Sequence, residues 1–220
     1  GELKWKNELR DIIISEALIT PKNIFVQTSS DVLYAFDLQT GDRVWSKKAQ
    51  APLLSIRGTS SPVFFEGLVF ANFSNGRLAA IRATDGIQLW EKPISVIKGS
   101  TELEKLMDSD SPAVAFNDIV FAANYNGSLT RFNIRGGEKA FSVDLSTSKP
   151  FILYKDTIIA VNSDDEIVAF DAINGSQTWK NSKYKFRRLT APTLYDDYLY
   201  FGDIGGYLHK VDPATGEIVG

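Results

Sequence analysis

Short apolar runs separated by polar turn residues recur along the chain, and their order repeats in five blocks of 24 residues. The blocks span residues 22–45, 67–90, 118–141, 156–179 and 197–220. Each opens with a run of β-branched and aromatic residues bounded by turn residues, as at residues 68–71, which predicts a strand. Repetition at a period of about 40 to 50 residues in short strands is typical of a β-propeller or a related array.

Two turns divide each block. The first follows the opening strand, at Asn75-Gly76 in one block and Gly205-Gly206 in another. Such pairs suit a two-residue hairpin in which both central residues have positive φ. The second turn is clearest at residues 37–41, where the Asp37 carboxylate is expected to accept backbone N–H bonds and Gly41 to take the left-handed conformation.

All four tryptophans occupy one position of this repeat, its last residue. They are Trp5, Trp45, Trp90 and Trp179, and Phe141 takes the position in a further block. A glycine stands four residues before the end of every block, at Gly41, Gly86, Gly137, Gly175 and Gly216. A large flat ring on an outer strand can pack against the neighbouring sheet and bury about 150 to 250 Å². We therefore interpret these rings as staples between blades.

An additional short strand is predicted ahead of each block. It begins with proline in four cases, at residues 62–65, 112–115, 150–153 and 192–195, and residues 12–19 take its place in the first. Four antiparallel strands per unit make a propeller blade. The prediction is one all-β propeller domain over residues 1–220. Its units are residues 6–45, 46–90, 91–141, 142–179 and 180–220, with residues 1–5 as the outer strand of a preceding blade.

Composition narrows the choice of partner. The 24 basic residues against 27 acidic ones leave a net charge of −3, so no general attraction to nucleic acid or an anionic membrane is expected. The absence of cysteine removes disulfides, thiolate metal sites and cysteine nucleophiles. No signal peptide or apolar stretch of membrane-spanning length is visible. Because the chain begins and ends inside a repeat, we expect it to be a fragment of a longer protein.

The connections between blades vary most in length, and all of them are expected on one rim of the propeller, where binding residues are common. One connection carries Leu54, Ile56 and Arg57, and the longest carries Asp108 and Asp110 after a predicted short helix at residues 101–107. These residues could form a patch of apolar anchors and orienting charges that binds a protein partner. They could instead be core residues and a solvated ion pair, and the residues alone favour this second interpretation.

Other polar segments offer weaker candidates. The basic and aromatic run at residues 183–188 could contact nucleic acid or a lipid headgroup, but we interpret it as alternation on an outer strand. His209 is the only histidine and has no nucleophile elbow with it, so it is interpreted as a strand residue. The acidic turn at residues 164–166 is interpreted as solvated, and residues 108–111 begin like a calcium loop without completing one.

Residues 34–45 resemble the repeat of the quinoprotein dehydrogenases, which carries an A-x-D-x-x-T-G-x-x-x-W motif. Residues 168–179 are similar. Non-enzymatic propellers share this motif, and the chain lacks the vicinal cysteines typical of those dehydrogenases. The resemblance therefore implies the propeller superfamily but gives little support to quinone chemistry.

Segments outside the repeat carry a closer resemblance, to the BamB family of propeller lipoproteins in the bacterial outer-membrane β-barrel assembly machinery. They are residues 54–58, 99–110, 123–127 and 202–209. This resemblance implies an eight-bladed ring, of which the chain would supply about five blades. It also implies docking onto the POTRA domains of BamA. Leu54, Ile56 and Arg57 match the family's L-x-L-R segment, with Ile56 in place of leucine, and Asp108 and Asp110 match its D-x-D segment.

The resemblance further implies a scaffold with no catalytic residues, cofactor or metal, which assists the folding and insertion of nascent outer-membrane proteins. Its expected location is the periplasmic face of the bacterial outer membrane, through an N-terminal lipid anchor that this chain does not contain. The alternatives are a quinone-dependent dehydrogenase-like propeller and the sensor propeller of another envelope protein.

Overall fold

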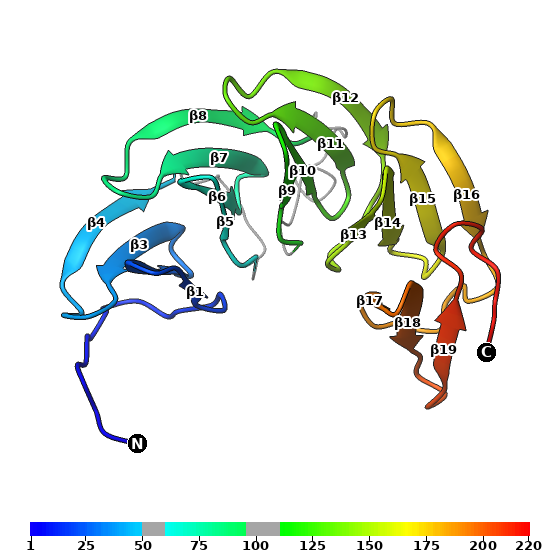
Figure 1. The fold of residues 1–220 in the computed structure, drawn as a ribbon, viewed down its shortest axis with the longest axis horizontal. Coiled ribbons are helices and arrows are strands. Elements are labelled where there is room, and N and C mark those ends of the chain that lie inside the picture. The colour runs from blue at the N-terminus through cyan, green and yellow to red at the C-terminus, as the bar shows by residue number, and fades with distance from the viewer. Residues whose placement is uncertain (50–59, 96–110) are drawn as a thin grey trace, which may run out of the picture.

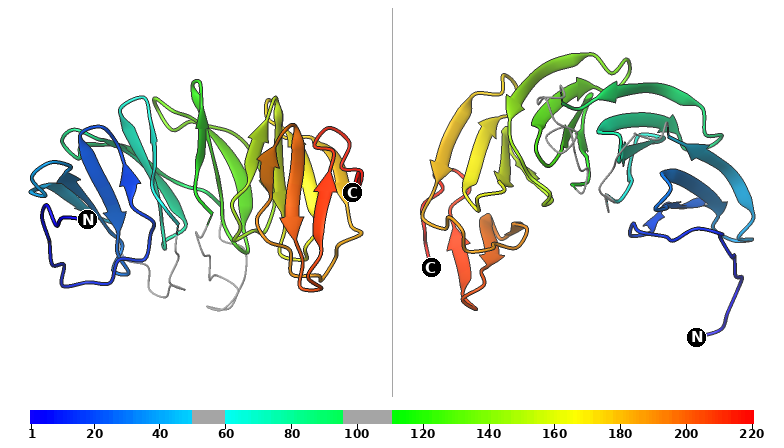
Figure 2. Two further views of the ribbon diagram at one scale, coloured as in Figure 1. Left: turned by 60° about the horizontal axis from the view of Figure 1, so that its bottom comes forward. Right: turned by 180° about the vertical axis from the view of Figure 1, so that it is seen from behind.

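The computed structural model describes residues 1–49, 60–95 and 111–220, which form an open arc of five antiparallel sheets (Figure 1). Seen from a lower angle, the sheets stand side by side like blades, with their turns on two opposite edges (Figure 2). Four of the sheets have four strands in sequence order, and the last has three. The architecture is that of a partial β-propeller, as the repeat predicts.

The strands of each sheet follow one another along the chain. The first sheet contains β1 (Leu18–Ile19), β2 (Asn23–Gln27), β3 (Val32–Asp37) and β4 (Arg43–Lys48). The second contains β5 (Val63–Phe65), β6 (Leu68–Phe73), β7 (Arg77–Arg82) and β8 (Gln88–Pro93). The third contains β9 (Val114–Phe116), β10 (Ile119–Ala123), β11 (Ser128–Asn133) and β12 (Lys139–Asp144). The fourth contains β13 (Ile152–Tyr154), β14 (Thr157–Val161), β15 (Ile167–Asp171) and β16 (Gln177–Asn181), and the fifth contains β17 (Thr193–Tyr195), β18 (Tyr198–Gly202) and β19 (Leu208–Val211).

The tryptophan of one sheet docks on the turn glycine of the next. The Trp45 indole N–H donates to the Ala83 carbonyl at 2.9 Å, and a Cβ added to Gly86 would lie 2.8 Å from the indole ring. Trp5, Trp90 and Trp179 make the same N–H bond to Leu38, Ile134 and Pro213. Phe141 packs in this way on Gly175 without an N–H to donate. The rings therefore link neighbouring sheets as predicted.

A bulge recurs beside the docked ring in the first four sheets. Ala35 pairs with Trp45 and Ala80 pairs with Trp90. In both sheets the register shifts at the next residue of the third strand, β3 or β7. The third and fourth sheets shift at the same place. Because a bulge locally increases strand twist, it can turn the outer strand so that its ring faces the neighbouring sheet.

The hydrophobic core lies between the sheets. Four buried clusters each combine residues of two neighbouring sheets, as where Phe25 and Leu33 of the first sheet meet Val69 and Ile81 of the second. These four side chains have no exposed surface. Each sheet thus buries both of its faces only when a neighbour stands on each side, which is why such units occur in arrays.

The second turn has the predicted chemistry in the first, fourth and fifth blocks, where it begins with aspartate. The Asp37 carboxylate accepts the backbone N–H groups of Gln39 and Thr40 at 2.8 and 2.9 Å. The hydrogen bond from Thr40, followed by that from Gln39, lowers the pKa of Asp37. The five turn glycines have φ between 68° and 79°.

The first turn differs from the expected two-residue hairpin. Gly76 has positive φ but Asn75 does not, and the Gly76 N–H bonds to the Phe73 carbonyl at 3.0 Å. This pattern is that of a type I turn followed by a left-handed bulge residue. Two consecutive residues of positive φ occur instead one turn earlier in the unit, at Glu66 and Gly67 between β5 and β6.

The two ends of the chain contain less strand than predicted. Of residues 12–19, only β1 forms a strand, with an isolated bridge from Ile13 to Thr28. The Ser15 hydroxyl accepts the Gln27 N–H at 2.9 Å, so a side chain replaces a ladder bond there. Residues 1–5 form no strand, although Trp5 docks in its expected place. The outer strand of the last sheet is reduced to a bridge between Val211 and Ile218.

Substitution of a turn glycine tests the docking. Gly86→Ala is expected to destabilise the fold by about 2 to 4 kcal/mol, because it adds a clash with Trp45 to the strain of φ +74°. Gly67→Ala is the matched control, since φ is +82° but its Cβ would meet nothing within 4 Å. The free energy of unfolding of Gly67→Ala should fall by only about 1 kcal/mol. Urea unfolding of both variants measures the difference, and equal losses would contradict the docking role of the ring.

Candidate functional site

The five predicted partner-binding residues, Leu54, Ile56, Arg57, Asp108 and Asp110, lie outside the described residues, as does the helix predicted at residues 101–107. The structure does describe where the chain leaves and re-enters on either side of them. Both connections join the fourth strand of one sheet to the first strand of the next, β4 to β5 and β8 to β9. They belong to one edge of the arc, which also carries the turns between the second and third strands, and we call this edge the connection rim.

The re-entry points of the two connections meet on the connection rim. The Ser60 hydroxyl donates to the Ser111 carbonyl at 3.2 Å, although 51 positions separate these residues. The side-chain amide of Asn72 donates to the same carbonyl at 2.6 Å. Ser60, Asn72 and Ser111 are all buried. The residues that follow the two candidate segments are therefore held together by buried hydrogen bonds.

The points of departure are held as well. The Ala49 N–H donates to the Asp31 carbonyl at 2.9 Å. The Ser95 hydroxyl, one blade along, accepts the backbone N–H of Ser128 at 2.8 Å and lies 3.3 Å from Asn124 Oδ1. Both ends of each connection are thus fixed to the sheets by hydrogen bonds.

A line of buried polar groups, which we call the polar seam, joins three neighbouring blades on the connection rim. The Gln27 side-chain amide donates to the Asn72 carbonyl at 2.9 Å, and Asn72 in turn reaches Ser111. Gln27 Oε1, Asn72 Oδ1 and Ser111 Oγ are buried and have no hydrogen-bond partner among the described residues. This polar seam was not predicted from the sequence. Its signal is an amide residue at or just after the second strand of four successive sheets: Gln27, Asn72, Asn124 and Asn162.

The acidic turn at residues 164–166 is not solvated as a whole, so that interpretation was wrong. Asp165 and Glu166 are each 6% exposed. Glu166 binds Lys180 at 2.7 Å and also accepts hydrogen bonds from Asn162 and Ser182. The bond from Lys180, followed by that from Asn162, lowers the pKa of Glu166 to about 2.

Asp165 fastens the next connection to the fourth sheet. Its carboxylate binds the Lys149 ammonium at 2.9 Å and accepts the backbone N–H groups of Arg188 and Leu189 at 2.7 and 3.0 Å. Burial acts to raise the pKa of Asp165, but the hydrogen bonds from Lys149 and these N–H groups outweigh burial and lower it. Buried carboxylates with such partners fix loop geometry because they satisfy backbone donors that would otherwise be left unpaired.

The basic run at residues 183–188 is not an outer strand, so that interpretation was also wrong. Strand β16 ends at Asn181, and the run forms turns on the connection rim. Tyr184 is buried against Phe201 and His209, at ring-centroid distances of 4.9 and 4.6 Å. Phe186, by contrast, is 72% exposed.

His209 lies on β19 and is paired with a carboxylate. Its Nε2 lies 2.8 Å from Asp203 Oδ2, and Arg187 Nε donates to the same oxygen at 2.6 Å. The contact with His209 contributes most to lowering the pKa of Asp203, although burial opposes it. Within the described part of the chain, no serine hydroxyl is bonded to His209, and no group of three metal-binding side chains is present.

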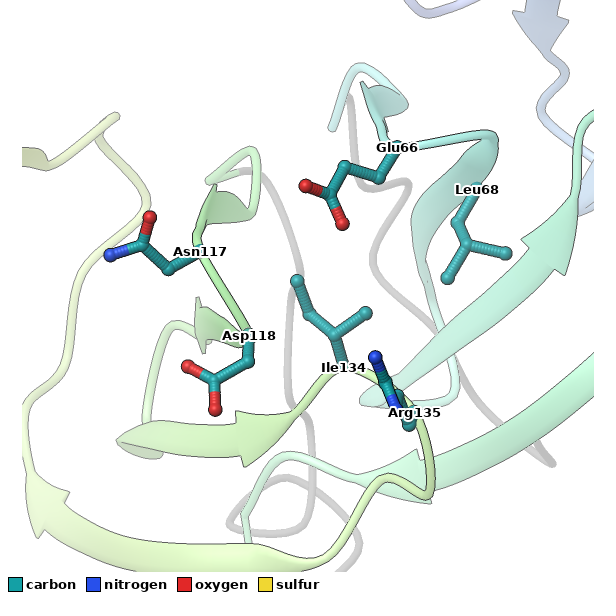
Figure 3. A pocket seen from close by; sticks show the side chains of 6 residues that line it. All are labelled: Glu66, Leu68, Asn117, Asp118, Ile134 and Arg135. Atoms are coloured by element: carbon teal, nitrogen blue, oxygen red, sulfur yellow. The ribbon is translucent and has the colours of Figure 1, made fainter.

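The opposite edge of the arc holds a groove of ≈ 410 Å³ between the second and third sheets. Figure 3 shows the six side chains that line it: Glu66, Leu68, Asn117, Asp118, Ile134 and Arg135. Its charged residues, Glu66, Asp118 and Arg135, are all exposed. The connection rim therefore remains the stronger candidate for recognition.

A model of the family described as outer membrane protein assembly factor BamB matches residues 1–181. The chain belongs to the BamB family. It is 31% identical to the BamB of Yersinia pestis over 219 residues, which is 100% of this chain and 56% of that protein. It is 36% identical to the BamB of Escherichia coli K12 over 168 residues, covering 76% of the chain and 43% of that protein.

Solved structures agree with this assignment. BamB from Moraxella catarrhalis superposes with a TM-score of 0.91 at 29% identity, over 100% of this chain and 66% of that one. A europium-containing methanol dehydrogenase superposes with a TM-score of 0.77 at 13% identity, over 100% of this chain and 52% of the enzyme. At that identity the likeness shows only a shared fold. The chain spans about half the length of the curated BamB proteins that it matches.

No helix among the described residues is long and apolar enough to cross a membrane.

The buried Glu166 predicts a pH dependence of stability. Its folded-state pKa of about 2 lies below the ordinary value of 4.5. Such a carboxylate stabilises the fold above its unfolded pKa, and this contribution is lost as the pH falls through the folded pKa. Glu166→Gln should therefore cost about 1 kcal/mol at neutral pH and remove part of the stability loss between pH 4.5 and 2.

Urea unfolding over this pH range measures the effect. Asp164→Asn is the control, because Asp164 lies in the same turn with its side chain 52% exposed. An unchanged pH profile for Glu166→Gln would show that the ion pair with Lys180 does not contribute.

Proposed function

We propose that the chain is the docking portion of a non-catalytic scaffold that assists the assembly of β-barrel proteins in the bacterial outer membrane. Its partner is the POTRA region of BamA, and the docking residues are Leu54, Ile56, Arg57, Asp108 and Asp110. The proposed location is the periplasmic face of the outer membrane, through a lipid anchor at the N-terminus of the full-length protein. Nascent outer-membrane proteins are the proposed clients of the assembled complex.

Membership of the BamB family is the first support, because the relatives are named as outer membrane protein assembly factors. The observation that carries the site is the bond between Ser60 and Ser111. It holds together the described residues that follow the two candidate segments, which supports a single partner surface that contacts both. Nothing in the sequence requires Ser60 and Ser111, which are 51 positions apart, to meet in this way.

The residue types suit a protein interface. Leu54 and Ile56 stand two positions apart, as apolar neighbours on one face of an extended segment do. Arg57 can donate two parallel hydrogen bonds to a carboxylate, while Asp108 and Asp110 can receive basic groups of the partner. In such interfaces the apolar anchors supply most of the affinity, and the charges set orientation and association rate.

Charge reversal at the connection rim tests this proposal. Arg57→Glu and Asp108→Arg should each weaken binding to purified POTRA domains about a hundredfold or more. Each reversal would set a charge of the same sign against the charged group of the partner. Isothermal titration calorimetry measures the affinity. The thermal unfolding midpoint should stay unchanged in both variants.

Matched controls carry the same substitutions elsewhere. Arg43→Glu changes an exposed residue of β4, and Asp118→Arg changes one on the opposite edge of the arc. Both should bind the POTRA domains as the parent chain does. Full affinity in both connection-rim variants would refute the proposed docking residues.

The alternative of quinone chemistry is tested separately. We expect no saturable binding of pyrroloquinoline quinone in the presence of calcium, since likeness to the dehydrogenases extends to the fold alone. Fluorescence titration provides the measurement. Saturable binding accompanied by dye-linked oxidation of an alcohol would replace the scaffold proposal with an enzymatic one.

A further inference from the structure

The turn after β16 has a strained backbone and exposes the Phe186 ring to solvent. Phe186 has φ 61° and Arg188 has φ 50°, conformations that side chains with a Cβ rarely adopt. The Phe186 N–H donates to the Asp164 carbonyl at 2.9 Å, and the Arg188 N–H donates to the buried Asp165 carboxylate at 2.7 Å. Strained residues that the surrounding structure holds in place are common at recognition sites.

The hairpin between β18 and β19 extends this exposed apolar surface. The Ile204 N–H donates to the Arg187 carbonyl at 2.9 Å, so the hairpin lies directly against the turn. Ile204 is 66% exposed and Tyr207 is 63% exposed. The Arg187 guanidinium stacks over the Tyr207 ring at 5.8 Å. We call Phe186, Ile204 and Tyr207, with the flanking Lys183, Lys185 and Arg188, the aromatic rim surface.

A buried carboxylate supports this surface from beneath. The Asp203 side chain has no exposed surface and binds both Arg187 and His209. It also accepts the backbone N–H groups of Gly205 and Tyr207 at 2.8 and 3.2 Å. One buried carboxylate therefore fixes the turn and the hairpin relative to each other. A surface that is already ordered loses less entropy on binding than a mobile one.

Charge on the aromatic rim surface is positive, although the whole chain has a net charge of −3. Arg187 is neutralised by Asp203, and Lys185 lies 3.7 Å from the half-exposed Asp164. Lys183 and Arg188 are exposed and form no ion pair with any residue that the structure describes. Two cations, one before and one after Phe186 in the sequence, thus have no carboxylate of their own among the described residues.

We propose that the aromatic rim surface binds an acidic peptide segment that carries apolar side chains between its carboxylates. Aromatic and arginine side chains surrounded by a charged border are typical of protein-binding surfaces. Two unpaired cations fall short of the roughly four to eight that bind anionic membranes. They fall equally short of the multiple phosphate contacts that nucleic acid binding requires. The observations therefore favour a peptide.

This surface is separate from the proposed BamA-docking residues, being formed by the fourth and fifth sheets on the same rim. It is built entirely from described residues and does not depend on the identity of the partner at Leu54, Ile56 and Arg57. Failure of one proposal therefore leaves the other standing.

The test is fluorescence anisotropy with a labelled twelve-residue peptide in which glutamates flank two phenylalanines. We expect saturable binding. Lys183→Glu combined with Arg188→Glu should weaken it about tenfold or more, and Phe186→Ser should do the same, because each removes an anchor of the interface. A peptide with lysine in place of glutamate should not bind, and one with serine in place of phenylalanine should bind weakly.

Lys48→Glu, an exposed charge reversal on β4, is the matched control and should bind as the parent does. Circular dichroism on heating verifies that each variant is folded. Absence of saturable peptide binding up to about 1 mM, the top of the affinity range for weak contacts, would overturn the proposal. Equal binding by the parent and the variants would also overturn it, as would binding only to phosphatidylglycerol vesicles or single-stranded DNA.

Discussion

The contact on which the architecture depends is an aromatic ring lying against a glycine of the neighbouring sheet. A Cβ on that glycine would overlap the ring, and the left-handed backbone at the same position disfavours other residues. Glycine is therefore required twice over, by space and by conformation. The indole N–H adds a directed bond to the next turn, which apolar packing alone would not supply. Repetition of this contact sets the sheets side by side in an arc.

Because the docking contacts and the cores are formed between neighbouring sheets, the connections that join the blades are free to differ in length. The structure nevertheless ties their ends firmly to the sheets. Gln27, Asn72 and Ser111 form a buried polar line across three sheets, and Ser60 joins it at the far end. This chain can thus carry connections of different length while their points of attachment stay fixed.

Buried carboxylates perform the same task farther along the connection rim. Asp165 and Asp203 each accept two backbone N–H groups from turns and each bind a basic side chain. Burying a carboxylate is costly unless such partners are present, so these residues order the turns around them. The exposed position of Phe186 follows from this, because the turn that presents it is held through Asp164 and Asp165.

The sequence by itself determined the all-β repeat, the tryptophan position and the left-handed turn glycines, because these follow from local and periodic requirements. It also carried the BamB family resemblance. Only the tertiary structure decided which polar residues are buried. Glu166 looked solvated in its turn, but Lys180 reaches it from the next strand along the sheet. Ser60 and Ser111 gave no local signal, since their bond exists only when neighbouring sheets are packed together.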